Sequence, residues 1–164
     1  MKKIKLAKNK YALVDDEDFE IVNKYKWQDN GYGYARRTIR TNNKYKTLYM
    51  HRFILGIYDT KIQVDHIDRN KLNNQKHNLR LATRNKNMCN TEKHKIINGN
   101  NTSSKYKGVH WSKKSKKWCA QIKVNGKFIY LGLYKNEKSA ALAYNKAAKK
   151  HFGEYALLNS VKED

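Results

Sequence analysis

Residues 63–90, QVDHIDRNKLNNQKHNLRLATRNKNMCN, decide the expected fold of the N-terminal half of this chain. The apolar positions just before Asp65-His66 predict a short strand, and a polar loop rich in Asn and Lys follows it. Residues 79–81, Leu-Arg-Leu, alternate in the manner of a second strand, and Thr83 is a good N-cap for a short helix that ends near residue 90. We therefore predict strand, loop, strand and helix, a piece too small to be stable without neighbours.

The polar residues of this stretch suit the hydrolysis of a phosphodiester. Such a reaction needs a hard cation on the phosphate and a general base whose pKa lies near the working pH, as that of a histidine such as His66 does. The carboxylate of Asp65 and the amide oxygen of Asn87 are hard ligands, which suit Mg²⁺ or Mn²⁺ better than Zn²⁺. Asn78 can hydrogen-bond across the loop and so fix the position of His66.

The same residues resemble the H-N-H nuclease motif, in the form carried by phage and intron-encoded homing endonucleases. The matching residues are Asp65-His66, then Asn78 within Asn78-Leu79-Arg80, and then Asn87. The resemblance implies a ββα-metal (His-Me finger) nuclease core in which His66 activates a water and Asn78 stabilises the loop that orients this base. It also implies that Asp65 and Asn87 bind the metal. The alternative is that these polar residues only cap turns.

Basic residues around the motif are expected to hold DNA. Arg80 and Arg84 lie next to the two metal ligands, and we expect them to clamp the scissile phosphate. A short helix closed by Gly56 carries His51-Arg52, and the homing family also has a His-Arg pair there. We expect His51 and Arg52 to be structural or to contact DNA, and we do not expect His51 to be catalytic.

The first third of the chain predicts strands, a helix and a basic hairpin. Alternating apolar residues indicate two short strands within residues 4–13, and the acidic run 15–18 suits the start of a helix. A four-carboxylate metal site at this run is the weaker alternative. After a turn at residues 30–33, the hairpin at 34–49 carries Arg36, Arg37 and Arg40, which can hold phosphates or simply form a solvated strand face.

The C-terminal third predicts three strands and one helix. The strands are expected at 106–111, 118–124 and 127–132, and Asn125-Gly126 is a strong signal for the hairpin between the last two. Asn136 is the expected cap of a helix that runs to about residue 150, with Gly153 just past its end. The helix is rich in alanine, so it can lie close on the sheet.

This module resembles the Apetala/ethylene-response-factor (ERF) DNA-binding domain, which is also found fused to phage homing endonucleases. The matching pieces are the residues 106–109 (YKGV), Trp118-x-Ala120, Leu131-Gly132, the helix 140–148 (AALAYNKAA) and the tail 157–159 (LLN). The resemblance implies that the free face of the sheet binds DNA. The predicted contacts are Lys107, His110, Lys113, Lys114, Gln121, Lys123, Lys127 and Tyr130. The sheet has no arginine, so we expect phosphate contacts to dominate and expect Trp111 and Trp118 to pack.

The composition supports a nucleic-acid partner. The 164 residues include 36 Lys and Arg against 14 Asp and Glu, a formal net charge of +22, and such a surplus predicts a polyanion, with nucleic acid ahead of an anionic membrane. No apolar run approaches the roughly 20 residues that span a bilayer, and no apolar segment follows the basic N-terminus as in a signal peptide. The two cysteines form no CxxC pair, so we expect no cysteine-based zinc ribbon and predict a cytoplasmic protein with reduced thiols.

Together these patterns predict an α+β protein of two modules. We place a strand-helix-strand extension at residues 1–48, the ββα-metal nuclease core at 49–91 and the ERF-type domain, a three-stranded antiparallel sheet packed on one helix, at 105–160. The polar stretch 92–104, with Asn, Gly and Ser at its end, is the predicted linker. All arginines precede residue 85, which also favours two modules.

The expected activity is metal-dependent hydrolysis of double-stranded DNA, with Mg²⁺, or else Mn²⁺, as the cofactor and no membrane partner. We expect a monomer, with a dimer as the alternative. One catalytic site per chain would nick one strand, and a double-strand break would require a dimer or a second binding event. Two other functions stay open: a non-catalytic DNA-binding regulator with a decayed nuclease motif, and an RNA-binding protein, for which no clear recognition motif is present.

Overall fold

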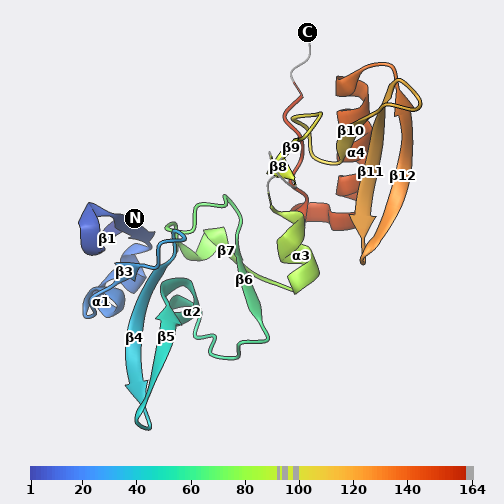
Figure 1. Ribbon diagram of the computed structural model, residues 1–164. Helices are drawn as coiled ribbons and strands as arrows, with labels where there is room; N and C mark the ends of the chain where they lie inside the picture. Colours follow the sequence, from blue (N-terminus) through green and yellow to red (C-terminus); the bar gives the residue numbers. More distant parts are fainter. Residues whose placement is uncertain (92, 94–95, 98–99, 162–164) are drawn as a thin grey trace. The chain divides into compact units, whose positions relative to one another are not determined.

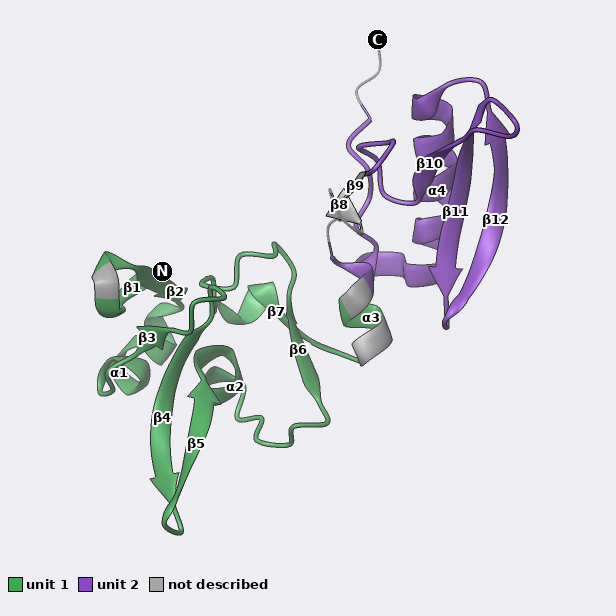
Figure 2. Ribbon diagram, in the orientation of Figure 1, with its two compact units in different colours: residues 1–87 green, residues 88–164 purple. Residues whose placement is uncertain are grey.

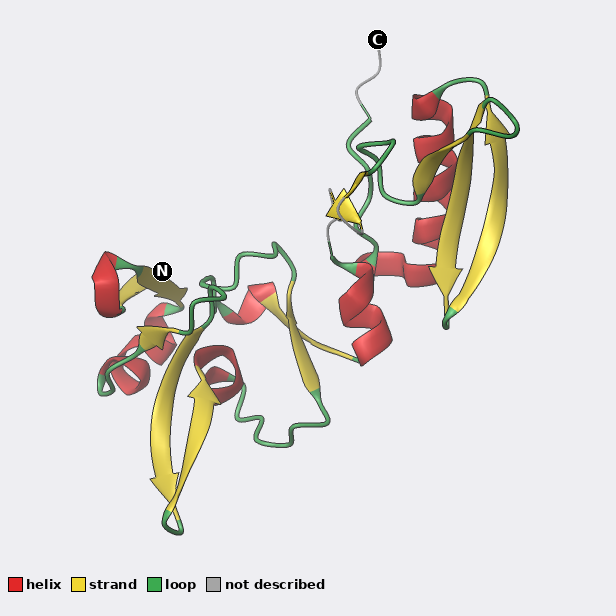
Figure 3. Cartoon of the chain, in the orientation of Figure 1, coloured by secondary structure: helices red, strands yellow, loops and turns green. Residues whose placement is uncertain are grey.

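The computed structural model describes residues 1–91, 93, 96–97 and 100–161, and the chain divides into two compact units, residues 1–87 and 88–164 (Figure 2). Parts of the predicted linker, residues 92, 94–95 and 98–99, lie outside the described residues. Both units combine small antiparallel sheets with a few helices (Figure 3), so the predicted mixture of helices and strands is confirmed. Within the described residues, every helix is too short or too polar to cross a bilayer.

Unit 1 contains three antiparallel sheets, with strand orders β1-β2, β3-β4-β5 and β6-β7 (Figure 1). Its elements, together with α3, which continues into unit 2, are β1 (Lys2–Lys5), the 3-10 helix η1 (Ala7–Asn9), β2 (Tyr11–Val14), α1 (Asp16–Asn23), β3 (Gln28–Asp29), β4 (Ala35–Thr41), β5 (Lys44–Tyr49), α2 (Met50–Ile54), β6 (Gln63–His66), the 3-10 helix η2 (Lys76–Asn78), β7 (Leu79–Ala82) and α3 (Arg84–Cys89). The two early strands, the helix after the acidic run and the basic hairpin all occur where the sequence predicts them.

The N-terminal extension supplies the hydrophobic core of unit 1. Fully buried apolar side chains from β1, β2, α1 and α2 pack together, among them Ile4, Val14, Val22 and Met50. Burying each such side chain contributes about 1.5–3 kcal/mol of transfer free energy. The indole of Trp27 joins this core and donates a hydrogen bond of 2.9 Å to the Val22 carbonyl. The segment that carries the H-N-H residues contributes Met50 and the partly buried Leu72 to this core, and the other buried side chains of the cluster come from residues 1–48.

The end of β2 holds the long loop between β6 and β7. The backbone of Leu13 pairs with this loop through hydrogen bonds of 2.7 Å to the Leu72 carbonyl and 2.8 Å from the Asn74 amide. The carboxylate of Asp15 accepts hydrogen bonds from the Gln75 side chain at 3.0 Å and from the Lys76 amide at 2.7 Å. The first residue of the acidic run thus anchors the loop, while the next three residues fall in the first turn of α1, as predicted.

Unit 2 is built on one three-stranded sheet and one long helix. Its elements after α3 are β8 (Ile96–Ile97), β9 (Asn100–Asn101), β10 (Val109–Ser112), β11 (Lys117–Val124), β12 (Lys127–Tyr134), α4 (Glu137–Phe152) and the 3-10 helix η3 (Gly153–Tyr155). The sheet has the order β10-β11-β12 and is antiparallel, and α4 packs against its strands (Figure 1). Ala120 and Ile122 of β11 meet Ala140, Tyr144 and other small or aromatic residues of the helix.

The first strand of this sheet differs from its predicted bounds. The pattern predicts residues 106–111, whereas β10 covers Val109–Ser112. Gly108 has a φ of +75°, which ends an extended strand, and a Cβ at this position would lie 2.0 Å from the Tyr144 ring and 2.6 Å from the Gln121 carbonyl oxygen. The glycine therefore lets the chain turn where it touches α4, and the strand starts one residue later.

The last strand is longer than predicted. Strand β12 runs to Tyr134, which pairs with Trp118, and the register of its pairing with β11 shifts at Ala120/Gln121. Trp118 forms an edge-to-face contact of 5.1 Å with Trp111, which is itself 39% exposed, so the two tryptophans pack on each other. Asn136 accepts a hydrogen bond from the Ser139 amide at 2.8 Å and caps α4, as the sequence predicts.

Two lysines join residues 89–93 to residues 106–109, just before and at the start of the three-stranded sheet of unit 2. The ammonium of Lys107 donates to the carbonyls of Cys89 and Thr91, each at 2.7 Å. The ammonium of Lys93 donates to the carbonyls of Tyr106 and Val109, at 2.8 and 2.9 Å, and burial lowers its pKa below the ordinary value. Lys93, the second residue of the predicted linker, is therefore fixed by two hydrogen bonds.

Candidate active site

Residues 63–90 fold in the predicted order of strand, loop, strand and helix. Strands β6 and β7 are antiparallel, with Asp65 opposite Arg80 and His66 opposite Leu79, and α3 follows β7. The amide of Lys86 donates to the Thr83 hydroxyl at 3.3 Å, which confirms the predicted N-cap. Asp65 and His66 are the last two residues of β6, so their side chains leave opposite faces of the strand.

Asn78 closes the loop that follows His66. Its amide nitrogen donates to the Asp68 carboxylate and to the Asn73 carbonyl, both at 2.8 Å, and its amide oxygen accepts from the Asp68 amide at 2.9 Å. Although burial raises the pKa of Asp68, the hydrogen bonds that its carboxylate accepts from Asn73, Asn78 and Asn70 bring it below its ordinary value. This buried amide thus crosses the loop as its predicted role requires.

His66 is almost fully buried, with 4% of its surface exposed, and its ring lies among other rings. The His51 imidazole meets it edge-on at 5.1 Å, and the Tyr34 ring lies 5.9 Å away. Burial lowers the pKa of His66 below its ordinary value, and this effect exceeds the opposing effects of the Asn74 side chain, Asp68 and Asp65. At neutral pH the imidazole is therefore uncharged and able to accept a proton.

His51, whose ring contacts that of His66, is also buried. It projects from α2 and stacks on the Tyr49 ring at 5.6 Å, and its Nδ1 has no hydrogen-bond partner. Burial, with smaller effects from His66 and Arg52, lowers the pKa of His51 to about 3. His51 is therefore a neutral packing partner of the candidate base. With 7% of its surface exposed, it offers almost no area for the DNA contact that was also expected of it.

The buried His51 makes folding sensitive to mild acid. Its pKa is about 3 in the folded chain against an ordinary value of 6.5, so below pH 6.5 the unfolded chain binds a proton that the folded chain excludes. We expect the free energy of unfolding to fall by up to about 1.4 kcal/mol per pH unit from this residue alone. Urea unfolding at pH 7, 6 and 5 measures this slope. The variant His51→Phe should have a flatter slope than the wild type, and equal slopes would contradict the assignment.

Asp65 is paired with an arginine. The Arg80 guanidinium donates to one carboxylate oxygen, Oδ2, through Nε at 2.9 Å and Nη2 at 2.7 Å, and both side chains are largely buried. Arg80 was predicted to clamp the scissile phosphate, but in the structure its guanidinium is paired with Asp65, the predicted metal ligand. The side chain of Arg84, the second predicted clamp, lies outside the described residues.

Asn87 lies over the face of β6 that carries Asp65. Its amide nitrogen donates to the Gln63 side-chain oxygen at 3.1 Å. Gln63 and Asp65 are two residues apart in β6, so their side chains lie on the same face of the strand. This bond fixes which end of the amide is the acceptor. A carboxylate and an amide oxygen suit a hard divalent cation such as Mg²⁺. Among the described residues no group of three or more His, Cys, Asp or Glu side chains is placed to hold a metal ion, so a cation at Asp65 and Asn87 would also bind water or phosphate oxygens.

The structure divides the predicted DNA contacts of the hairpin between its two faces. Arg36 and Arg40 lie opposite Tyr49 and Tyr45, on one face, whereas Arg37 belongs to the other. The Arg37 guanidinium sits 3.7 Å from the centre of the Tyr25 ring, and its Nη1 is buried without a hydrogen-bond partner. Arg52 donates to the backbone carbonyls of Asp59 and Ile62, where it holds the loop before β6.

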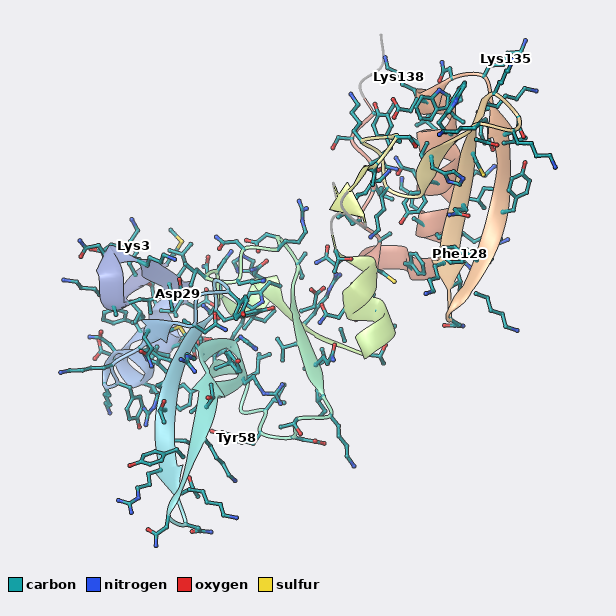
Figure 4. All side chains as sticks on the ribbon, in the orientation of Figure 1. Lys3, Asp29, Tyr58, Phe128, Lys135 and Lys138 are labelled. Atoms are coloured by element: carbon teal, nitrogen blue, oxygen red, sulfur yellow. The ribbon has the colours of Figure 1, made fainter. Side chains whose placement is uncertain are left out.

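Four of the eight predicted contacts of unit 2, His110, Gln121, Lys123 and Tyr130, lie on the sheet face away from α4. Ala120 and Ile122 point to the helix, so their neighbours in β11, Gln121 and Lys123, point to the opposite face, with Tyr130 paired to Gln121. Phe128, paired with Lys123, is 65% exposed (Figure 4). His110 shares this face, Lys113 and Lys114 lie in the turn before β11, and Lys127 begins β12. Lys107 precedes the sheet, and its ammonium is held by two carbonyls.

Comparison with known proteins identifies the class to which this fold and site belong. The family model described as HNH endonuclease matches residues 50–89, which span α2, both strands of the Asp65–Arg80 pair and α3. An uncharacterized HNH endonuclease of Acanthamoeba polyphaga mimivirus is 35% identical over 160 residues, which cover 94% of this chain and 78% of that protein. The chain therefore belongs to the HNH endonuclease family, and it is a DNA endonuclease.

Several residues of the site were not found from the sequence. Tyr34 packs on His51 and His66 and approaches the ammonium of Lys71, and Asn74 is completely buried beside the base. The turn before Tyr34 is a recognisable signal, because Asn30 accepts hydrogen bonds from the amides of Tyr32 and Tyr34. Nothing in the local pattern indicates that this turn delivers a ring to His66, since the two residues are far apart in the sequence.

Proposed function

We propose that this endonuclease hydrolyses DNA phosphodiesters with a divalent metal, Mg²⁺ or else Mn²⁺, and that His66 is the general base. The observation that carries the proposal is the state of His66: a buried, uncharged imidazole next to Asp65 and at the start of a loop closed by Asn78.

Each residue of the site has a distinct task in this proposal. His66 accepts the proton of the attacking water, while His51 and Tyr34 limit the motion of its ring. Asp65 and Asn87 would hold the metal, which when bound supplies a Lewis acid for the phosphate and the leaving oxygen. Arg80 orients the Asp65 carboxylate through its two hydrogen bonds. The segment 49–91 is then a ββα-metal core.

We further propose that unit 2 anchors the enzyme on DNA as an ERF-type domain. The sheet face with His110, Gln121, Lys123 and Tyr130 combines positive charge, hydrogen-bonding groups and exposed rings, which suits a groove lined by phosphates. The ammonium of Lys123 lies 5.4 Å from the centre of the Phe128 ring, which keeps the charge at the surface of the sheet. The enzyme would act as a monomer and nick one strand per encounter.

A plasmid assay tests the proposed reaction. Supercoiled plasmid is incubated with the full chain and Mg²⁺, Mn²⁺ or EDTA, and the fraction of relaxed circles is measured. Relaxation that needs a divalent metal supports the proposal, and equal relaxation in EDTA contradicts it. If generic plasmid is not cut, the assay is repeated on DNA selected by binding to the chain, and metal-dependent cutting there is still required.

Removal of residues 105–164 should weaken DNA binding and leave slow nicking. The nuclease residues and their core lie in unit 1, whereas the truncation removes the sheet and many lysines. Because each lost phosphate contact lowers affinity, we expect binding to weaken at least tenfold, measured by mobility shift. A truncated chain that binds its DNA as tightly as the full chain would exclude an anchoring role. Circular dichroism checks that the remaining residues are folded.

A further inference from the structure

The proposed reaction needs a cation for the phosphate, and the arginine predicted for this role is engaged elsewhere. Arg80 donates twice to Asp65 and is largely buried. A phosphodiester brings one negative charge per nucleotide into the site, and this charge grows toward the leaving oxygen during hydrolysis. The loop between β6 and β7 begins directly after His66, and it carries an exposed lysine, Lys71, to which no role has been assigned.

The side chain of Lys71 is held near the candidate base by the Tyr34 segment. Its ammonium lies 4.6 Å from the centre of the Tyr34 ring and donates to the Tyr32 carbonyl at 3.1 Å. The same tyrosine ring lies 5.9 Å from the ring of His66. The Lys71 ammonium and the His66 ring therefore both lie close to the same tyrosine ring. In agreement with this position, the charge of Lys71 is one of the effects that lower the pKa of His66.

The loop that carries Lys71 is unusually well fixed. Leu72, the next residue, accepts a backbone hydrogen bond from Leu13 at 2.7 Å, and the loop is crossed by the hydrogen bonds of Asn78 to Asp68 and Asn73. An ammonium has three N–H donors, and one of them is used by the Tyr32 carbonyl. Protein contacts thus orient the Lys71 side chain, while the residue stays exposed to an incoming ligand.

We propose that Lys71 binds a DNA phosphate at the active site, next to the bond that His66-activated water attacks. This inference rests on the proposed function and adds a residue to it. A lysine acts as a compact point charge, which suits a phosphate oxygen. Tyr34 is then a positioning residue for both sides of the reaction: it packs against the base and holds the cation. Lys71 could alternatively serve only to fasten the loop to the turn at Tyr32, and the experiment separates the two roles.

The test uses the full chain and a synthetic duplex that contains a nicking site mapped on plasmid. Lys71→Met removes the charge, Lys71→Arg keeps it, and Lys61→Met removes a matched exposed charge from the loop before β6. At saturating DNA we expect Lys71→Met to lower kcat about 10- to 100-fold, less than the roughly 10²–10³-fold loss for a buried oxyanion-hole donor, because Lys71 is exposed. Lys71→Arg should retain most of the rate, and Lys61→Met should retain all of it.

Neutral methylphosphonates, introduced one at a time near the nicked bond, identify the phosphate. At the phosphate that Lys71 binds, the neutral group should lower the wild-type rate, and Lys71→Met should then cause no further loss. An equal loss with every duplex would show a role in loop structure and overturn the inference, as would Lys71→Met cleaving at the wild-type rate. Wild-type chain that cuts no DNA with Mg²⁺ or Mn²⁺ would instead overturn the proposed function, and this inference with it.

Discussion

Replacing His66 with alanine is expected to reduce DNA cleavage by about 10²–10⁴-fold, the usual contribution of a general base. Burial keeps the imidazole uncharged, and its ring is flanked by His51 and Tyr34. Neither of these two neighbours is expected to replace it as the base, because the pKa of His51 is lowered to about 3 and that of Tyr34 is raised. Binding of the duplex should change little, because a buried ring with 4% of its surface exposed offers almost no area to DNA. Cleavage is measured in single turnover with Mg²⁺, and binding is measured with Ca²⁺ in its place.

Because His66 is buried, the alanine variant leaves a cavity, and lost activity must be separated from lost folding. His66→Gln fills most of the space and cannot act as a base at neutral pH, so it should be as inactive as His66→Ala while retaining more stability. His151→Ala, which removes an exposed imidazole on α4, is the matched control and should cleave at the wild-type rate. Folded His66→Gln protein that cleaves normally would show that another group activates the water.

The sequence predicted the elements whose signals are local. The hairpin at Asn125-Gly126 and the cap at Asn136 depend on the backbone preferences of a few consecutive residues, and both occur as expected. The predicted start of β10 was wrong, because the true start depends on a contact between Gly108 and Tyr144 of α4, which are far apart in the sequence. A pattern of alternating residues contains no information about which helix will lie against a strand.

The candidate site shows the same limit. The adjacency of Asp65 and His66 and the later Asn78 could be recognised as a set, and the structure brings Asn78 across the loop that follows His66. The pairing of Arg80 with Asp65 follows from strand register, which a sequence alone does not specify at this precision. Likewise, burial of His51 depends on the packing of α2 against the hairpin and on no local motif.

Affinity for DNA is expected to fall steeply as salt rises. The chain has a net charge of +22, and the proposed contacts with DNA are mostly from lysine and arginine. For a protein that makes about 6–10 phosphate contacts, counterion release predicts a loss of about 10³–10⁵ in affinity between 50 and 200 mM salt. Fluorescence anisotropy of a labelled duplex at several salt concentrations, with Ca²⁺ to prevent cleavage, gives the slope of log K against log salt.

Two arginines of one strand provide a matched comparison for this slope. Arg40 is exposed near the end of the hairpin, whereas Arg37 is stacked on the Tyr25 ring from the other face. If Arg40 binds a phosphate, Arg40→Gln should reduce the magnitude of the slope by about 0.9, the value for one contact. Arg37→Gln removes the same charge but should leave the slope unchanged and lower the stability of unit 1, because it removes a stacking contact. A flat salt response of the wild type, or equal slopes for Arg40→Gln and the wild type, would show that the hairpin does not bind the DNA backbone.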